Sequence, residues 1–133
     1  METCRTTVTL NVRMCPRILL VDDIAVVRTT LRSLLADYTI CGEAENGRVA
    51  VDQVKKLKPD VVIIDITMPV MNGLQATVEI RRIAPSTKII LFTINDSPEA
   101  QQAARMVGAH ALVPKSMAGR DLLQTLQRFT LEN

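Results

Sequence analysis

Two hydrophobic patterns alternate along the chain from residue 17 onward. Short, largely apolar runs are typical of strands buried in a sheet. After each run, apolar residues recur three and four positions apart, which is the spacing of an amphipathic helix. The predicted strands are Ile18–Val21, Ile40–Glu45, Val61–Ile64, Lys88–Thr93 and Ala111–Val113. The pattern therefore predicts five strands that alternate with five helices.

Turn and capping residues indicate where the helices begin and end. Asn46 and Gly47 begin a turn into the second predicted helix, and Pro59 lies just beyond its end. Ser97 followed by Pro98 is typical of an N-cap and a first helical position. These signals agree with the boundaries that the hydrophobic periodicity predicts.

Alternating strands and helices favour a parallel sheet, because each parallel connection needs a crossover that a helix can supply. We therefore expect one doubly wound α/β domain over residues 16–131, with helices on both faces of its sheet. Residues 1–15 precede the first strand and are predicted to form a flexible N-terminal arm; an added edge strand is the alternative.

Composition and charge narrow the class of protein. The chain has 133 residues, of which 47% are hydrophobic and 23% charged, as expected for one soluble globular domain. The net charge of +2 lies within residues 1–17, and the remainder of the chain is formally neutral. Since nucleic-acid binders usually carry a basic stripe, direct nucleic-acid binding by the domain is not expected.

Cysteine usage and hydropathy bear on the cellular compartment. Three cysteines without CxxC spacing and a single histidine favour neither a disulfide framework nor a zinc site. The longest uncharged stretch, residues 66–78, is interrupted by Pro69 and Gly73 and is too short to cross a membrane. We therefore expect a cytoplasmic protein that does not insert into a membrane.

The candidate chemistry lies just after the predicted strands. In an open parallel sheet, ligands bind beyond the carboxyl ends of the strands. The residues at those ends are Asp22, Asp23, Asp65, Thr93 and Lys115. Each taken alone is ordinary, since an aspartate can cap a helix or begin a turn and the other two can be surface residues. Together they predict a shared site.

Three carboxylates at one sheet edge need a counter-charge. At a separation of ~5 Å and an effective dielectric of ~20, each pair repels by roughly 3 kcal/mol. A divalent cation with oxygen ligands answers this, and Mg²⁺ suits such a site, with Mn²⁺ or Ca²⁺ as substitutes. A carboxylate beside the cation can attack phosphorus, while an ammonium and a hydroxyl stabilise the phosphoryl oxygens. Asp65, Lys115 and Thr93 supply these three groups.

The ordered set of motifs resembles the receiver domain of bacterial two-component response regulators over residues 16–131. The resemblance rests on Asp22-Asp23, on the segment from Asp65 to Gly73 (DITMPVMNG), on Leu91-Phe92-Thr93 and on Val113-Pro114-Lys115. It implies a flavodoxin-like sheet with strand order 2-1-3-4-5.

The resemblance also implies a function and a set of site residues. Asp65 would be phosphorylated by a sensor histidine kinase or a phosphotransfer protein. Mg²⁺ would be held by Asp23, Asp65 and the backbone carbonyl of Thr67, with Asp22 acting largely through water. Such a domain assists only its own phosphotransfer and dephosphorylation, so it is not expected to be an enzyme. Its partner would be a downstream protein or a C-terminal output domain, and a homodimer is possible.

Some positions depart from the family pattern and leave alternatives. Leu112 stands where many receivers carry an aromatic residue, and Ser116 follows Lys115 where proline is frequent. A degenerate receiver that acts by protein contact alone is therefore the second hypothesis. An aspartate-dependent phosphatase is the enzyme alternative, but such enzymes typically have a second aspartate two residues after the nucleophile, where this chain has Thr67. A flavin-binding domain is disfavoured because Asp22 and Asp23 would repel a phosphate.

Overall fold

The predicted strands pair in parallel in the order β2-β1-β3-β4-β5 in the computed structural model, which describes residues 16–131. Their bounds are Arg17–Val21 (β1), Thr39–Ala44 (β2), Val61–Asp65 (β3), Lys88–Thr93 (β4) and Ala111–Pro114 (β5). Strand β3 lies at the centre of the sheet and all five of its residues are buried. The strand order and fold class are those predicted. The arm predicted for residues 1–15 lies outside the described residues.

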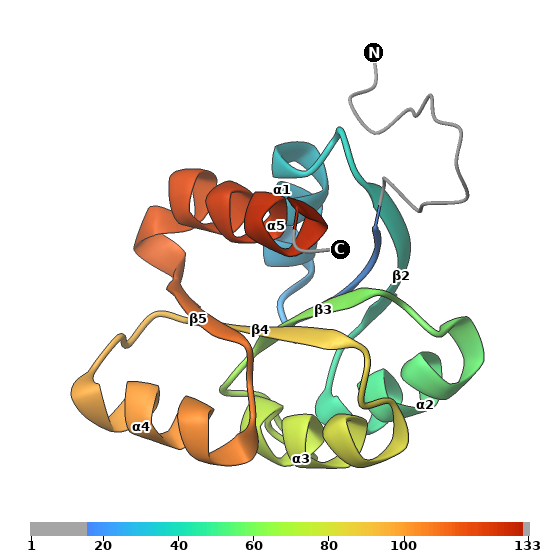
Figure 1. Cartoon of the computed structure of the whole chain (residues 1–133), viewed down its shortest axis with the longest axis vertical. Coiled ribbons are helices and arrows are strands. Elements are labelled where there is room, and N and C mark those ends of the chain that lie inside the picture. Colours follow the sequence, from blue (N-terminus) through green and yellow to red (C-terminus); the bar gives the residue numbers. More distant parts are fainter. Residues whose placement is uncertain (1–15, 132–133) are drawn as a thin grey trace.

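Helices cover both faces of the sheet, as expected for a doubly wound fold (Figure 1). Helices α1 and α5 pack on one face, and α2, α3 and α4 pack on the other. Their bounds are Ala25–Leu34 (α1), Gly47–Leu57 (α2), Gly73–Ile83 (α3), Pro98–Val107 (α4) and Leu123–Leu131 (α5).

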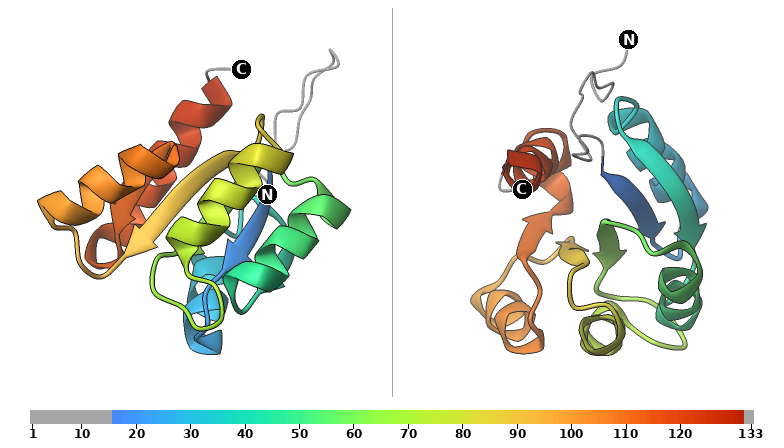
Figure 2. Two further views of the ribbon diagram at one scale, coloured as in Figure 1. Left: turned by 90° about the horizontal axis from the view of Figure 1, so that it is seen from below. Right: turned by 45° about the vertical axis from the view of Figure 1, so that its right-hand side comes forward.

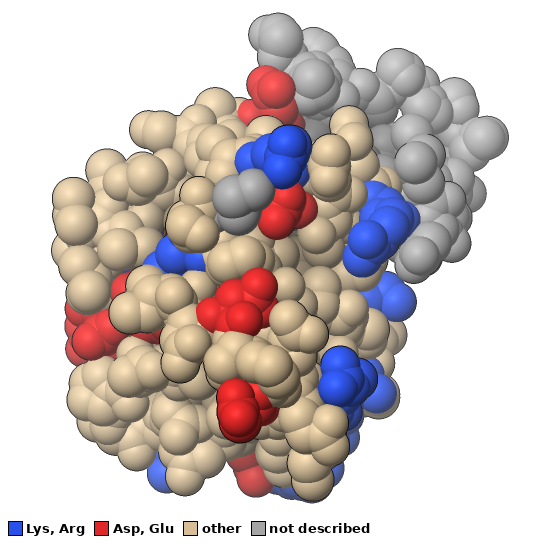
Figure 3. Space-filling view, turned by 90° about the vertical axis from the view of Figure 1, so that its left-hand side faces the viewer, with Lys and Arg blue, Asp and Glu red and all other residues tan. Residues whose placement is uncertain are grey.

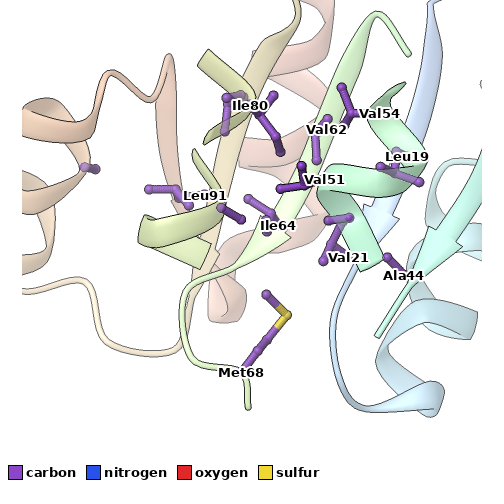
Figure 4. Close-up of a cluster of buried hydrophobic side chains, with 14 residues drawn as sticks. Leu19, Val21, Ala44, Val51, Val54, Val62, Ile64, Met68, Ile80 and Leu91 are labelled. Atoms are coloured by element: carbon purple, nitrogen blue, oxygen red, sulfur yellow. The ribbon is translucent and has the colours of Figure 1, made fainter. Parts of the chain in front are cut away.

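The sheet separates two apolar cores, because successive side chains of a strand point to opposite faces. Leu19, Val62 and Leu91 belong to the core under α2, α3 and α4, which Figure 4 shows. Ile18, Ile63 and Ile90 belong to the core under α1 and α5. Aliphatic residues dominate both cores, in a chain with two phenylalanines, one tyrosine and no tryptophan. Met68, in the loop that follows β3, packs its side chain against the end of this first core (Figure 4).

Side-chain caps fix the starts of three helices. Ser97 caps α4 with Pro98 at the first position, as predicted. Asn46, predicted only to begin a turn, also caps α2, and its side chain accepts a hydrogen bond from the Val49 N–H. Asn72 and Gln75 form a reciprocal capping box at the start of α3. All three of these helices begin at the carboxyl edge of the sheet, so the caps hold the loops that surround the candidate site.

Two local features differ from the regular elements that the pattern predicts. Strand β2 has a bulge, because Ile18 pairs with Ile40 while Leu19 pairs with Gly42, which leaves Cys41 without a partner in the register. The chain between β5 and α5 forms a 3₁₀ turn, Lys115–Met117, followed by a π-helical turn, Ala118–Leu122, so the regular α-helix begins only at Leu123. The described peptide bonds, including that between Lys115 and Ser116, are all trans.

Two further observations concern the hydropathy of the helices and the distribution of surface charge. No helix within residues 16–131 is long and apolar enough to cross a lipid bilayer. On the side of the molecule where α4 lies, acidic and basic residues are scattered and separated by uncharged surface (Figure 3).

Candidate functional site

The strands of the sheet are parallel (Figure 2), so their carboxyl ends lie at one edge. The predicted site residues stand at or just after those strand ends. Asp22 directly follows β1, Asp65 ends β3 and Thr93 ends β4. Lys115 directly follows β5. The register pairs Asp65 with Phe92 and Thr93 with Pro114, so these residues occupy neighbouring positions at the strand ends.

Asp22, Asp23 and Asp65 form an acidic cluster. One carboxylate oxygen from each lies within 4.8 Å of those of the other two. Asp22 is fully buried and Asp65 is 6% exposed, whereas Asp23 is exposed to solvent. The cluster thus has a buried floor of two carboxylates and one carboxylate at its opening.

Lys115 supplies the nearest positive charge. Its Nζ lies 3.0 Å from Oδ2 of Asp22 and 3.4 Å from Oδ1 of Asp65, and it also lies over the ring of Phe92. Burial acts to lower the pKa of Lys115, but the hydrogen bond and charge of Asp22, together with the charge of Asp65, outweigh it and raise that pKa. Lys115 therefore remains an ammonium that bridges the two buried carboxylates.

The electrostatic balance at Asp65 remains unfavourable to its ionised form. Burial raises the pKa of Asp65, and the charge of Asp22 raises it further. Lys115 and a hydrogen bond from the backbone N–H of Thr67 lower it, without cancelling the first two effects. One ammonium does not compensate three carboxylates, which leaves a site that attracts a further cation.

The donor set fits a hard divalent cation. The three carboxylates offer only oxygen ligands, which Mg²⁺ prefers, and the exposed Asp23 leaves room for water. The hydrogen bond from the Thr67 N–H places residue 67 beside Asp65. A role for the Thr67 carbonyl as a ligand stays a prediction.

The loop after Asp65 approaches the strand end very closely. A Cβ at Gly73 would lie 2.2 Å from the carbonyl oxygen of Asp65, so only glycine fits there. The Met71 N–H donates to the Pro69 carbonyl at 2.7 Å, a three-residue turn whose central residue, Val70, has a φ of 68°. This conformation is strained for a β-branched residue.

Thr93 is buried at the opposite side of the site, next to Lys115 in the order of strands. Its hydroxyl oxygen accepts a hydrogen bond from the Asn95 N–H at 3.0 Å and donates to the Asn95 carbonyl at 3.3 Å. The threonine thus holds the start of the loop that leads into α4. The next residue, Ile94, is 85% exposed.

One residue that lies beside the site, and not in it, was missed from the sequence. Arg28 lies in helix α1 among polar and apolar positions that alternate as in an amphipathic helix, yet its side chain is only 18% exposed. Its Nη1 donates to the backbone carbonyl of Asp22 at 2.7 Å. Its position gave no signal, because helical periodicity separates polar from apolar faces but does not identify the partner of a polar side chain.

Comparisons with known proteins agree with this fold and site. The family model for the response regulator receiver domain matches residues 18–127. The chain is 39% identical over 117 residues to the chemotaxis protein CheY of Thermotoga maritima, covering 86% of this chain and 98% of that protein. It is 34% identical to the nitrate/nitrite response regulator NarL of Escherichia coli, covering 84% of this chain but 53% of NarL. A crystal structure of a LuxR-family response regulator from an Aurantimonas species superposes with a TM-score of 0.84 and 30% identity, covering 90% of this chain and 87% of that one.

The fold and the acidic site define a signalling module that accepts a phosphoryl group. The chain belongs to the response regulator receiver domain family of two-component systems. The relatives include a protein of similar length and longer regulators of which the chain spans about half. The second hypothesis, a degenerate receiver, is not favoured.

Proposed function

We propose that Asp65 is the phosphoacceptor and that a sensor histidine kinase or a phosphotransfer protein donates the phosphoryl group. The observation that carries this proposal is the bridging of Asp65 and Asp22 by the ammonium of Lys115 beside a third carboxylate. Asp22, Asp23 and Asp65, with the backbone carbonyl of Thr67, would hold Mg²⁺; Mn²⁺ or Ca²⁺ could substitute. The domain would extend over residues 16–131.

Each residue has a distinct part in the transfer. A carboxylate oxygen of Asp65 attacks phosphorus, the bond from phosphorus to the donor's histidine nitrogen breaks, and the electron pair leaves with the imidazole. Lys115 stabilises negative charge on a phosphoryl oxygen, for which it must turn from Asp22 towards the new group. Thr93 donates its hydroxyl to another phosphoryl oxygen and so gives up its bond to the Asn95 carbonyl. Bound Mg²⁺ supplies charge neutralisation at the phosphoryl oxygens.

The phosphorylated domain would act by switching a protein-interaction face. We infer that the partner is a downstream protein or a C-terminal output domain, since the relatives include both short proteins and longer regulators. A homodimer is a further possibility for the active form. We propose a cytoplasmic location, no direct nucleic-acid binding by this domain, and no enzymatic activity beyond its own phosphotransfer and dephosphorylation.

The test is phosphorylation by a small donor. With Mg²⁺ and acetyl phosphate, the wild-type chain should gain one phosphoryl group by mass spectrometry, and Asp65→Ala should gain none. The lack of tryptophan excludes the usual fluorescence assay, so mass spectrometry or NMR is needed. Asp52→Ala, which removes an exposed aspartate of α2, is the control and should be labelled like wild type. Undiminished labelling of a folded Asp65→Ala would exclude the assignment.

A further inference from the structure

Arg28 connects the acidic cluster to two other elements of the domain. It lies in α1, and its Nη1 donates to the Asp22 carbonyl at 2.7 Å. Its Nε lies 2.8 Å from Oε1 of Glu43, in strand β2. Arg32, one helical turn further along α1, binds the other carboxylate oxygen of Glu43. Glu43 therefore holds Arg28 through Nε while Nη1 is bonded to Asp22.

The bonded carbonyl belongs to the peptide that joins Asp22 to Asp23. The other groups of Asp22 are also fixed: its N–H donates to the Ala44 carbonyl, Oδ1 accepts from the Ile24 N–H, and Oδ2 binds Lys115. The orientation of the peptide between Asp22 and Asp23 determines where the exposed Asp23 carboxylate points. A guanidinium bonded to this carbonyl resists rotation of that peptide.

We propose that Arg28, held by Glu43, is a positioning residue that directs the Asp23 carboxylate into the acidic cluster and so sets the affinity for Mg²⁺. This rests on the proposed function, because it takes the cluster as the cation site. Arg28 does not contact the cation or the phosphoryl group in this role. It acts through the peptide of Asp22, as partners one layer outside a metal site commonly do.

The sign of the effect separates positioning from simple electrostatics. Arg28→Met removes a positive charge near a cation site, and charge alone would make Mg²⁺ bind more tightly. Loss of positioning would instead weaken Mg²⁺ binding, by about tenfold, as is usual when an outer partner of a metal ligand is removed. The two explanations therefore predict opposite changes.

Arg32→Met is the matched control. It removes the same charge from the same helix and breaks the other bond to Glu43, but Arg32, within the described part of the chain, makes no hydrogen bond or ion pair with Asp22. We expect its Mg²⁺ affinity to equal that of wild type or to exceed it slightly. Mg²⁺ affinity would be measured by calorimetry and by the backbone amide shifts of residues 22–24 and 65–67, without any phosphodonor.

A second measurement tests whether Arg28 acts only on cation binding. At saturating Mg²⁺, acetyl phosphate should label Arg28→Met at the wild-type rate, because positioning matters only until the cation is bound. A labelling rate that stays low at every Mg²⁺ concentration would overturn the proposal, and so would unchanged Mg²⁺ affinity in a folded Arg28→Met.

A conservative pair keeps the test decisive if Arg28→Met does not fold. An ammonium at position 28 cannot bond both Asp22 and Glu43 with a rigid fork, so Arg28→Lys should bind Mg²⁺ more weakly than Arg32→Lys. Equal affinities in these two variants would overturn the proposal. If wild type itself neither binds Mg²⁺ nor is labelled, it is the proposed function that fails, and the two failures are thereby distinguished.

Discussion

The strands begin at one edge of the sheet, the amino edge, and end at the opposite one, the carboxyl edge. The two differ in how completely their charged and polar groups are paired. At the amino edge, polar groups pair with groups of opposite charge or with carbonyls. The Arg17 guanidinium donates to the carbonyls of Leu57 and Lys58 at the end of α2, and the Arg17 N–H donates to Oδ2 of Asp60. The buried Thr87 hydroxyl donates to the Pro59 carbonyl at 3.0 Å. At the carboxyl edge, three carboxylates lie together and the ammonium of Lys115 pairs with two of them.

This difference separates stability from function within one small domain. The amino edge satisfies its own polar groups and needs no ligand. The carboxyl edge retains a repulsion between carboxylates that a bound cation would relieve, and it also retains a strained turn at Val70. Variants at the amino edge should therefore lose stability, and variants that remove charge or strain at the carboxyl edge should gain it.

The largest expected effect is at the amino edge. Arg17→Met should lower the free energy of unfolding by about 2 kcal/mol, because two helix-terminal carbonyls lose a charged donor. Urea unfolding measures this. Arg82→Met, which breaks an exposed pair with Glu79, is the matched control and should cost less than about 0.5 kcal/mol. Equal losses would show that Arg17 does not cap α2 in solution.

The next effect has the opposite sign and depends on pH. Without divalent cations, Asp65→Asn should be more stable than wild type by about 1 kcal/mol at neutral pH, since it removes a buried carboxylate. Burial raises the pKa of Asp65, so the folded protein holds this proton more tightly than the unfolded chain. The wild type's stability from this group is full below the unfolded pKa and is lost as the pH rises through the folded one.

The advantage of Asp65→Asn should accordingly shrink as the solution is acidified below the raised pKa. Thermal melts over a pH series give this measurement.

Asp23→Asn removes an exposed charge and should show a smaller gain in stability of the same sign. Glu43→Gln serves as the reverse control: hydrogen bonds from Arg32 and Arg28 lower the pKa of Glu43, so this variant should be less stable than wild type at neutral pH and approach it in acid. A lower melting temperature for Asp23→Asn would contradict the repulsion argument.

A third effect concerns backbone strain at the carboxyl edge. Val70→Gly should raise the free energy of unfolding by about 0.5–1 kcal/mol, because glycine adopts the positive φ without a steric penalty. The Val70 side chain is 77% exposed, so little packing is lost. Val78→Gly is the matched variant on α3, where glycine should instead cost about 0.5–1 kcal/mol. The same substitution at two exposed valines is thus expected to change stability in opposite directions.

The smallest expected effect is at Leu112, in the response of the domain to a phosphoryl mimic. Thr93 holds the backbone of Asn95, so a new partner for its hydroxyl would release the loop before α4. Leu112 has no hydroxyl and packs partly buried against the core beside α4. With beryllofluoride, Thr93→Ala should suppress the amide shift changes over residues 93–106, and Leu112→Ala should largely preserve them. The reverse result would make β5 the switch.

Much of the fold could be predicted because it depends on local pattern. The run Val61–Ile64 is apolar at every position and becomes the buried central strand. The convergence of Asp22 and Asp65 followed from strand direction alone, since parallel strands end at the same edge. Their distances and burial are consistent with the site that the residue types predicted.

The remaining features depend on contacts that no periodicity encodes. The bond from Arg28 to the Asp22 carbonyl depends on how close α1 lies to the end of β1. The ion pair of Arg28 with Glu43 depends on the position of another strand, β2. The positive φ of Val70 contradicts the preference of valine, and its turn lies in the loop that brings Gly73 close to Asp65. The π-helical turn before α5 likewise has no signature in the spacing of leucines.

The bulge at Cys41 has a consequence for association between copies of the domain. Strand β2 is one of the two outermost strands of the sheet. A straight outermost strand presents a row of backbone groups to which another chain can add a strand. The extra residue interrupts that row between Ile40 and Gly42 and increases the local twist. The other outermost strand, β5, is four residues long and ends at Pro114, which has no N–H to donate. Both outer strands of the described sheet thus discourage growth into an intermolecular sheet, so association of two copies by strand addition is disfavoured on either side.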